Sequence, residues 1–243
     1  MLELNNLYHM DCMEGMAHFP DNFFDLAIVD PPYGGGSPEN NWEAKKRGRF
    51  GGSFNKYDIK ATRTSGGYAA KYGKNIEHWD TAPPPEYFIE LFRVSKNQII
   101  WGGNYFELPP TRCFVVWRKL TISESFSMAM CEYAWTSFND NAKWFEIAPQ
   151  GTKGEPRFHP TQKPIELYSK LLNHYAKDGF KILDTHVGSA SSLIACHRRG
   201  LEFIGFELDE GYYDAAAKRL AEEMEQIRID STPSKNEQIM LSI

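Results

Sequence analysis

The chain has 243 residues, of which 42% are apolar, and its formal net charge is −5. This length and apolar content predict one compact domain and exclude a chain that is disordered throughout. The sequence has no run of about 18 apolar residues and no basic start followed by an apolar segment, so we expect a soluble, cytoplasmic protein without a membrane partner or a secretory signal.

Five short apolar runs end at polar residues or glycines and are predicted to be strands. They are residues 24–29, 98–101, 113–117, 181–183 and 203–206. Four segments between and after them have helical patterns, at 85–95, 164–176, 191–199 and 210–225. Strands that alternate with helices predict an α/β fold with a doubly wound, mostly parallel sheet.

Two segments do not follow this alternation. Residues 34–78 are too long for an ordinary connection and are predicted to be a functional loop inserted in the domain. Residues 228–243 form a polar tail. The single domain is therefore predicted to span residues 1–227, including the insertion.

The four cysteines lie far apart and form no CxxC pair: Cys12, Cys113, Cys131 and Cys196. A disulfide framework or a zinc site needs closer or paired spacings. We therefore expect reduced thiols that pack in the protein, and no bound metal.

The segment VDPPYGGG, residues 29–36, follows the first predicted strand. Pro31 and Pro32 fix the backbone and remove two N–H donors. Asp30 and the carbonyl of Pro31 can then accept hydrogen bonds from one exocyclic amine, while Tyr33 offers a flat face for a base flipped out of duplex DNA. A turn held by the aspartate side chain is the alternative interpretation.

Acidic residues end three of the predicted strands, namely Asp30, Asp184 and Glu207. Ligands of open parallel sheets bind at the carboxyl ends of strands. The turn LDTHVGSASS leads into a helix starting near Ser191, whose backbone amides can approach an anion. Glu207, 23 positions after Asp184, is placed to bind ribose hydroxyls. Because GxGxxG is absent, one nucleoside with a charged tail fits better than a dinucleotide, and an ordinary strand–helix turn remains the alternative.

Four motifs occur in a distinctive order: DPPY, HPTQKP at 159–164, LDTHVGSASS, and FIGFELDEGYYDAAAKRL at 203–220. Together they resemble the S-adenosylmethionine-dependent DNA amino-methyltransferases of the β motif order, in which the catalytic motif precedes the cofactor motif. The resemblance covers most of residues 4–220 and fails mainly in 34–78. It implies the Rossmann-like fold of class I methyltransferases.

The resemblance also implies residue roles. Asp30, Pro31, Pro32 and Tyr33 would form the catalytic pocket. Asp11 and Cys12 would contact the adenine of the cofactor, Glu207 its ribose, and Lys163 its carboxylate. The full set expected around S-adenosylmethionine is Asp11, Cys12, Asp30, His159, Thr161, Lys163, Asp184, His186, Gly188, Ser189, Ala190, Ser191, Glu207, Leu208 and Tyr212.

One departure from the family pattern lies in the turn, which is usually DPFxGSGTT. Here Ala190 replaces a glycine and His186 replaces an aromatic residue. Because alanine is strained at positive φ, we expect either that Ala190 is not left-handed or that the loop is altered. We expect His186 to be a packing or polar substitution rather than a catalytic base.

In the family, an aspartate before PPY goes with adenine N6 more often than with cytosine N4. The resemblance therefore implies an adenine-N6 methyltransferase acting on double-stranded DNA, with cytosine N4 as the alternative. A homodimer is also open, since dimers are common among similar enzymes.

DNA contacts are predicted in the segment from Glu43 to Lys74, which has nine basic and two acidic residues. The basic residues are Lys45, Lys46, Arg47, Arg49, Lys56, Lys60, Arg63, Lys71 and Lys74. A solvated charged insertion is the alternative.

Three rival functions remain at this stage. They are a hydride-transferring dehydrogenase, a DNA-binding protein with a weakened cofactor site, and a methyltransferase acting on RNA or protein.

Overall fold

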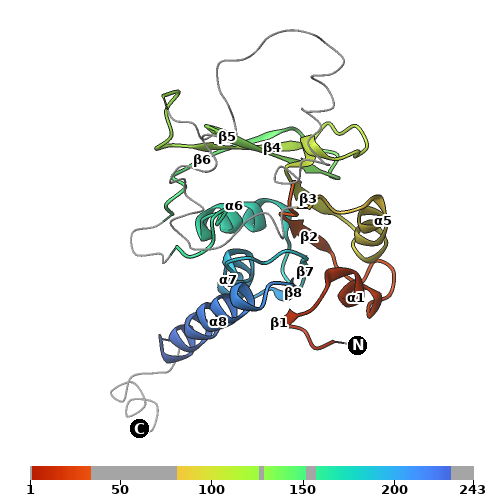
Figure 1. Cartoon of the computed structure of the whole chain (residues 1–243), viewed down its shortest axis with the longest axis vertical. Helices are drawn as coiled ribbons and strands as arrows, with labels where there is room; N and C mark the ends of the chain where they lie inside the picture. Colours follow the sequence, from red (N-terminus) through yellow and green to blue (C-terminus); the bar gives the residue numbers. More distant parts are fainter. Residues whose placement is uncertain (1, 34–80, 126–128, 152–156, 231–243) are drawn as a thin grey trace, which may run out of the picture.

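The computed structural model describes residues 2–33, 81–125, 129–151 and 157–230 (Figure 1). They form one eight-stranded sheet with helices on both faces. The strand order is β1-β8-β7-β2-β3-β5-β4-β6. Some neighbours in the sheet, such as β1 and β8 or β7 and β2, are far apart in the sequence, so the chain crosses over to bring them together. The predicted doubly wound α/β fold is confirmed.

Most strand pairings are parallel, as the alternation of strands and helices requires. Only the two pairings of β5, with β3 and with β4, are antiparallel. The strands are β1 Asn6–His9, β2 Leu26–Val29, β3 Gln98–Trp101, β4 Phe114–Lys119, β5 Cys131–Thr136, β6 Lys143–Ile147, β7 Lys181–Asp184 and β8 Glu202–Glu207.

The helices cover the sheet in two layers (Figure 1). They are α1 Cys12–Ala17, α5 Pro85–Val94, the short 3₁₀ helix η2 Gly103–Tyr105, α6 Ile165–Tyr175, α7 Ser191–Arg199 and α8 Glu210–Asp230. Leu26 and Ile28 of β2 belong to the core formed with α6 and α7. Ala27 and Val29 belong to the core formed with α1 and α5. The period-two alternation of β2 thus supplies both cores.

All five predicted strands and all four predicted helices are present within a few residues of their expected ends. The five predicted runs do not include β1, β5 or β6, and α1 is absent from the predicted helices. The polar tail was predicted to begin at 228, but α8 continues to Asp230. The remainder of the tail, from 231, and the predicted loop at 34–78 lie outside the described residues.

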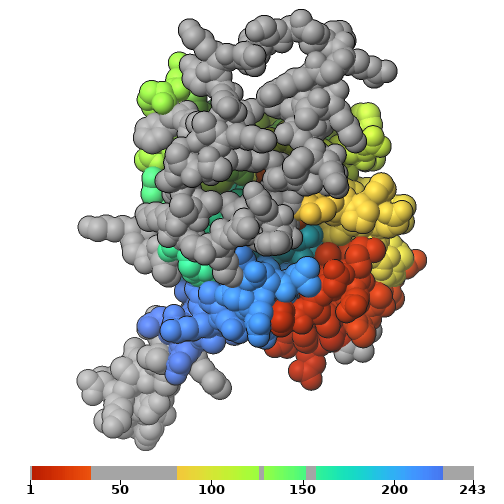
Figure 2. All heavy atoms as spheres, in the orientation of Figure 1, coloured from red at the N-terminus to blue at the C-terminus, as the bar shows by residue number. Residues whose placement is uncertain are grey.

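The parallel strands β8, β7, β2 and β3 end at one edge of the sheet. The N-terminal segment joins the same assembly because β1 pairs in parallel with β8. Figure 2 shows the N-terminal residues, in red, beside the C-terminal part of the chain, in blue. The residues that follow these strands, taken from both ends of the chain, therefore gather at this edge.

Candidate functional site

The segment after β2 holds Asp30 and Tyr33 together. The Tyr33 hydroxyl donates a hydrogen bond of 2.7 Å to Oδ1 of Asp30. Burial and the nearby charge of Asp30 raise the pKa of Tyr33, so its phenol stays protonated and acts as a donor. Between them, Pro31 and Pro32 fix the backbone. The prolines and the hydrogen bond between Tyr33 and Asp30 thus restrict the conformation of this loop.

Tyr33 rests on the loop that follows β3. Its ring stacks on Tyr105, with centroids 4.9 Å apart and planes at 17°. A Cβ atom at Gly102 would lie 2.1 Å from Cε1 of Tyr33, and Gly102 also has a φ of +66°. Both observations require glycine at this position. The sequence analysis missed Gly102 and Tyr105, although the Gly-Gly pair directly after a predicted strand was a usable signal.

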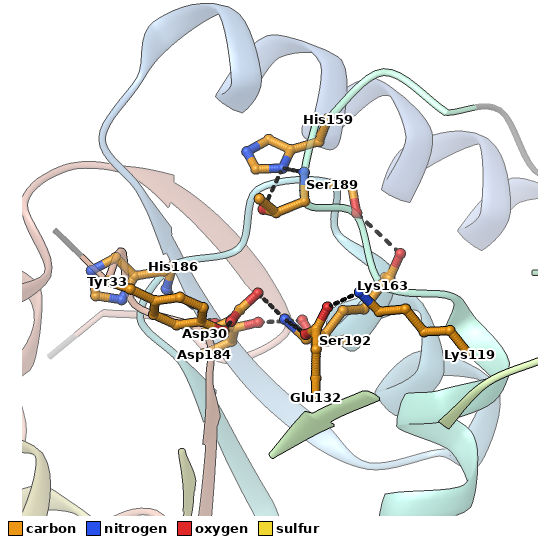
Figure 3. Close-up of polar contacts among 12 residues, drawn as sticks. Asp30, Tyr33, Lys119, Glu132, His159, Lys163, Asp184, His186, Ser189 and Ser192 are labelled. Atoms are coloured by element: carbon orange, nitrogen blue, oxygen red, sulfur yellow. Dashed lines mark hydrogen bonds and ion pairs between the residues drawn. The ribbon is translucent and has the colours of Figure 1, made fainter. Parts of the chain in front are cut away.

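A row of four charged side chains begins at Asp30 (Figure 3). Lys163 forms an ion pair with Oδ2 of Asp30 and a second, of 3.2 Å, with Glu132. Glu132 in turn pairs with Lys119 at 2.6 Å. The Lys163 side chain is only 3% exposed. Lys163, which was expected at the cofactor carboxylate, is thus paired with the predicted catalytic aspartate in this structure.

Opposite charges in this row shift the pKa values of Lys163 and Glu132 against the effect of burial. Burial alone would lower the pKa of Lys163, but Asp30 and Glu132 outweigh it and raise that pKa. Burial would raise the pKa of Glu132, but Lys163 and Lys119 lower it. Lys163 and Glu132 are therefore both charged around neutral pH. The sequence analysis named neither Glu132 nor Lys119.

Asp184, at the end of β7, pairs with no cation among the described residues. Its Oδ2 accepts a hydrogen bond from the Ser192 hydroxyl, and its Oδ1 accepts one of 3.0 Å from the His186 amide. The residue is 2% exposed. Burial, to which the charges of Asp30 and Glu207 add, raises its pKa to about 7.

His186 is fixed by its own neighbours in the turn. Its Nδ1 lies 2.9 Å from the Thr185 hydroxyl, which in turn lies 2.6 Å from the hydroxyl of Tyr87. Its ring meets Tyr87 edge to face. Burial lowers the pKa of His186 to about 4, so the imidazole is neutral at neutral pH. These contacts agree with a packing and polar role.

The turn crosses the left-handed region twice, at Gly188 with φ +56° and at Ala190 with φ +62°. Of the two outcomes expected for Ala190, avoidance of the left-handed region is therefore excluded. Ala190 is fully buried and forms the N-cap of α7, and it holds this conformation despite its steric cost. The cap has no side-chain hydrogen bond.

Two serines line the start of α7. The Ser189 and Ser191 hydroxyls lie 3.1 Å apart. The buried Arg219 of α8 donates to the carbonyl of Ser189 at 2.7 Å and to the Ser191 hydroxyl at 3.0 Å. Arg219, which the sequence analysis did not name, thus ties α8 to this turn.

Glu207, at the end of β8, accepts hydrogen bonds from two backbone amides. The Gly188 amide donates at 2.8 Å and the Asp209 amide at 3.0 Å. Burial raises the pKa of Glu207. The next residue, Leu208, is 66% exposed. An acceptor and an exposed apolar side chain thus stand next to each other beside the turn.

Asp11 and Cys12 follow β1, the strand beside β8. Asp11 caps α1 by accepting from the Met13 amide at 2.8 Å. Burial and the charge of Asp11 raise the pKa of Cys12 to about 12, so the thiol is neutral. The amide of Met10 donates to the carbonyl of Glu207 at 3.2 Å, which brings this pair to the same edge.

The HPTQKP segment, residues 159–164, packs against the turn that follows β7. The ring of His159 lies 4.3 Å from that of Tyr212, centroid to centroid, and a Cβ at Gly188 would meet it at 3.3 Å. The Thr161 hydroxyl lies 3.2 Å from Nδ1 of His159. The structure therefore brings His159, Thr161 and Tyr212 together near Gly188.

Comparisons with known proteins bear on this arrangement. Residues 111–218 match a family model described as DNA methylase. The type II methyltransferase M2.MboI of Moraxella bovis is 24% identical over 253 residues, which cover 89% of this chain and 88% of the relative. The chain is thus similar to DNA methylases, which confirms the predicted resemblance. The matched range contains two of the four motifs in full and residues 203–218 of the last, but not residues 30–33.

Solved structures confirm the fold. The M1.HpyAVI–SAM complex has a TM-score of 0.51 and 19% identity, covering 88% of this chain and 98% of that one. The PvuII DNA methyltransferase, described as cytosine-N4-specific, has a TM-score of 0.53 and 13% identity, covering 93% of both chains. At these identities the likeness concerns the fold alone.

The residues at the turn fit S-adenosylmethionine, which joins a nucleoside to a charged amino-acid tail. The uncapped start of α7 offers backbone donors to a carboxylate. Glu207 offers an acceptor for hydroxyl groups, and the exposed Leu208 offers an apolar surface for a base. Gly188 leaves only 3.3 Å between a Cβ and the His159 ring, so a larger residue would crowd the turn.

Several predictions remain outside this site. The nine basic residues predicted to contact DNA, Lys45 to Lys74, lie outside the described residues. Among the described residues there is no His, Cys, Asp or Glu cluster suited to a metal ion. In the same part of the chain, no helix combines the length and apolarity that crossing a bilayer requires. A cavity of about 450 Å³ opens near Gln98, at the opposite end of β3 from the site.

Proposed function

We propose that the protein is a DNA methyltransferase that transfers a methyl group from S-adenosylmethionine to the N6 amine of adenine in double-stranded DNA. One observation carries the proposal. Asp30 follows β2 and Asp184 ends β7, which is the neighbouring parallel strand, and Glu207 ends the next strand, β8. The residues predicted for catalysis and for the cofactor therefore share one edge of the sheet.

The proposed roles follow from the chemistry of the target. The lone pair of an aromatic amine is delocalised into its ring, so the nitrogen is a poor nucleophile. Asp30 and the carbonyl of Pro31 would accept hydrogen bonds from the amine and return electron density to the nitrogen. Tyr33 would stack on the flipped base. The protein's work is alignment and hydrogen bonding, without a covalent enzyme intermediate.

The cofactor would be held by the turn after β7. The first amides of α7 and Ser189 would face its carboxylate end, Glu207 its ribose, and Leu208 and Cys12 its adenine. When bound, S-adenosylmethionine supplies a methyl group activated by a sulfonium: the N–C bond forms as the C–S bond breaks, and the amine releases one proton to solvent.

DNA recognition is proposed for the basic segment between Lys45 and Lys74, which would neutralise phosphates. Adenine is preferred over cytosine because an aspartate precedes PPY at position 30. Relatedness to a type II methyltransferase supports a role in a restriction-modification system.

Methyl transfer to unmethylated DNA tests the proposal. The protein is incubated with DNA and S-adenosylmethionine carrying a tritiated methyl group, and the DNA is then digested and its bases separated. We expect label in N6-methyladenine. Label in N4-methylcytosine would show that cytosine, and not adenine, is the target base. Absence of label from the DNA would reject the proposed function.

Two variants assign the activity to the site. Asp30→Ala removes the main acceptor and is expected to abolish transfer. Asp178→Ala removes a carboxylate that is 88% exposed and that pairs with Arg199 at the surface, and it should keep full activity. If Asp30→Ala retained activity, the catalytic assignment would be wrong.

A further inference from the structure

The charged row beside Asp30 extends across four adjacent strands. Asp30 follows β2, Trp101 ends β3, Glu132 lies at the start of β5 and Lys119 ends β4. Because β5 runs antiparallel to its neighbours, its first residues reach the edge where the other strands end. All four residues therefore come to the same edge of the sheet.

These residues also share one face. In a strand, alternate residues point to the same side. Trp101 and Ala134 belong to the core under α6, so Glu132, two residues before Ala134, faces that side. Lys163 enters from the loop just before α6, and its ammonium lies 5.1 Å from the centre of the Trp101 ring. It thus bridges the carboxylates of β2 and β5 above the strand between them.

The arrangement restrains both oxygens of the Asp30 carboxylate. Oδ1 accepts from Tyr33 and Oδ2 from Lys163. Lys163 is in turn restrained by Glu132, and Glu132 by Lys119. The Glu132 side chain is partly buried, with 25% of its surface exposed, and the Lys119 side chain is 8% exposed. The plane of the Asp30 carboxylate is therefore fixed by a continuous chain of contacts.

Stability alone does not explain such a row. Replacing a buried ion pair with apolar residues is often neutral or stabilising. Catalytic groups, by contrast, must be held within roughly 0.5 Å and 10–20° of their working geometry. A carboxylate that accepts hydrogen bonds from a target amine gains from this restraint.

We propose that Lys163 and Glu132 are positioning residues for Asp30, and that Lys163 does not bind the cofactor carboxylate. The inference rests on the proposed function, because it assigns the purpose of the row to methyl transfer. Lys119 supports the row from its far end.

The test separates positioning from cofactor binding. Glu132→Gln and Lys163→Met are compared with the wild type by calorimetry with S-adenosylmethionine and by single-turnover methyl transfer to DNA. We expect the rate to fall on the order of 10-fold in Glu132→Gln and 100-fold in Lys163→Met. The dissociation constant of S-adenosylmethionine should stay within about 2-fold in both variants.

A double variant adds a readout that a general structural role would not produce. If both residues act through Asp30, Glu132→Gln in the Lys163→Met background should cost no further rate. Lys170→Met removes a lysine of α6 whose pair with Glu166 is exposed, and it serves as the control with unchanged rate. Variants are compared at a temperature where thermal melting shows each to be folded.

The opposite pattern would overturn the inference. In that pattern, Lys163→Met loses affinity for S-adenosylmethionine, and Glu132→Gln transfers methyl groups at the wild-type rate. If the wild-type protein transferred no methyl group to any DNA, the proposed function itself would be rejected. Crystal structures then decide the positioning claim alone: Asp30 should change orientation in Lys163→Met, and an unchanged carboxylate would refute it.

Discussion

Two parts of the same sheet edge hold their carboxylates in different ways. Beside β2, Asp30 and Glu132 are matched by the cations Lys163 and Lys119. Beside β7, Asp184 is surrounded by a hydroxyl and a backbone amide. Lys163 and Lys119 lower the pKa of Glu132, whereas burial raises the pKa of Asp184 to about 7.

The difference shows how burial is compensated in each region. Opposite charges keep a carboxylate ionised but need both partners to remain in place. Neutral donors tolerate the loss of the charge, because a protonated carboxyl can keep most of its contacts. The ion-paired region should therefore be sensitive to substitution, and the hydrogen-bonded region to pH.

The largest effect should come from breaking the ion-paired row. Lys163→Met leaves the carboxylates of Asp30 and Glu132 without their shared cation, so we expect the free energy of unfolding to fall by about 3–5 kcal/mol. Urea denaturation measures it. In Lys170→Met the lost pair is exposed, and the change should stay below about 0.5 kcal/mol. Equal losses in both variants would contradict the comparison.

The hydrogen-bonded region should give the next largest effect, through pH. Asp184 has a folded pKa of about 7, above its ordinary value of 3.8. Between these values the native state binds more protons than the unfolded state, so this residue makes stability fall as pH rises. The unfolding free energy of the wild type minus that of Asp184→Asn should drop by on the order of 3 kcal/mol from pH 4 to pH 7.

Glu132 provides the contrast for that experiment. Its folded pKa is lowered by Lys163 and Lys119, so its contribution is present above its ordinary value of 4.5 and is lost as pH falls further. The difference between wild type and Glu132→Gln should therefore shrink on acidification. If both stability differences, for Asp184→Asn and for Glu132→Gln, changed in the same direction with pH, the two regions would not differ in the way described.

The smallest effect concerns the backbone of the turn. Ala190 has a φ of +62°, where glycine carries no steric cost. Ala190→Gly relieves that strain but makes the unfolded chain more flexible, so we expect a gain of at most about 1 kcal/mol. Thermal unfolding measures it. A loss of stability would mean that the buried methyl group contributes more than the backbone costs.

Much of this arrangement was predictable from the sequence. The apolar runs at 24–29 and 181–183 are buried on both faces, which makes them recognisable, and the acidic residues that follow them mark the edge. The four motifs indicated the resemblance to DNA methylases, and the cofactor residues proposed above come from the same motifs. The strand β6 escaped prediction because its KWFEI sequence alternates between intermediate and exposed positions at the sheet border.

The partners of the motif residues were less accessible. Lys163 lies in a motif associated with the cofactor, and its contact with Asp30 spans 133 positions of sequence. Glu132 precedes Ala134 in a strand whose direction cannot be read from its own residues. Only the order of β2, β3, β5 and β4 in the sheet brings these side chains together.

The reversal of β5 has a consequence for protein engineering. Grafting the DPPY loop and the cofactor turn onto a wholly parallel scaffold would transfer both recognisable motifs and still leave Asp30 without its distant anchor. A transplant of this chemistry should therefore include the hairpin from Phe114 to Thr136 as a single cassette.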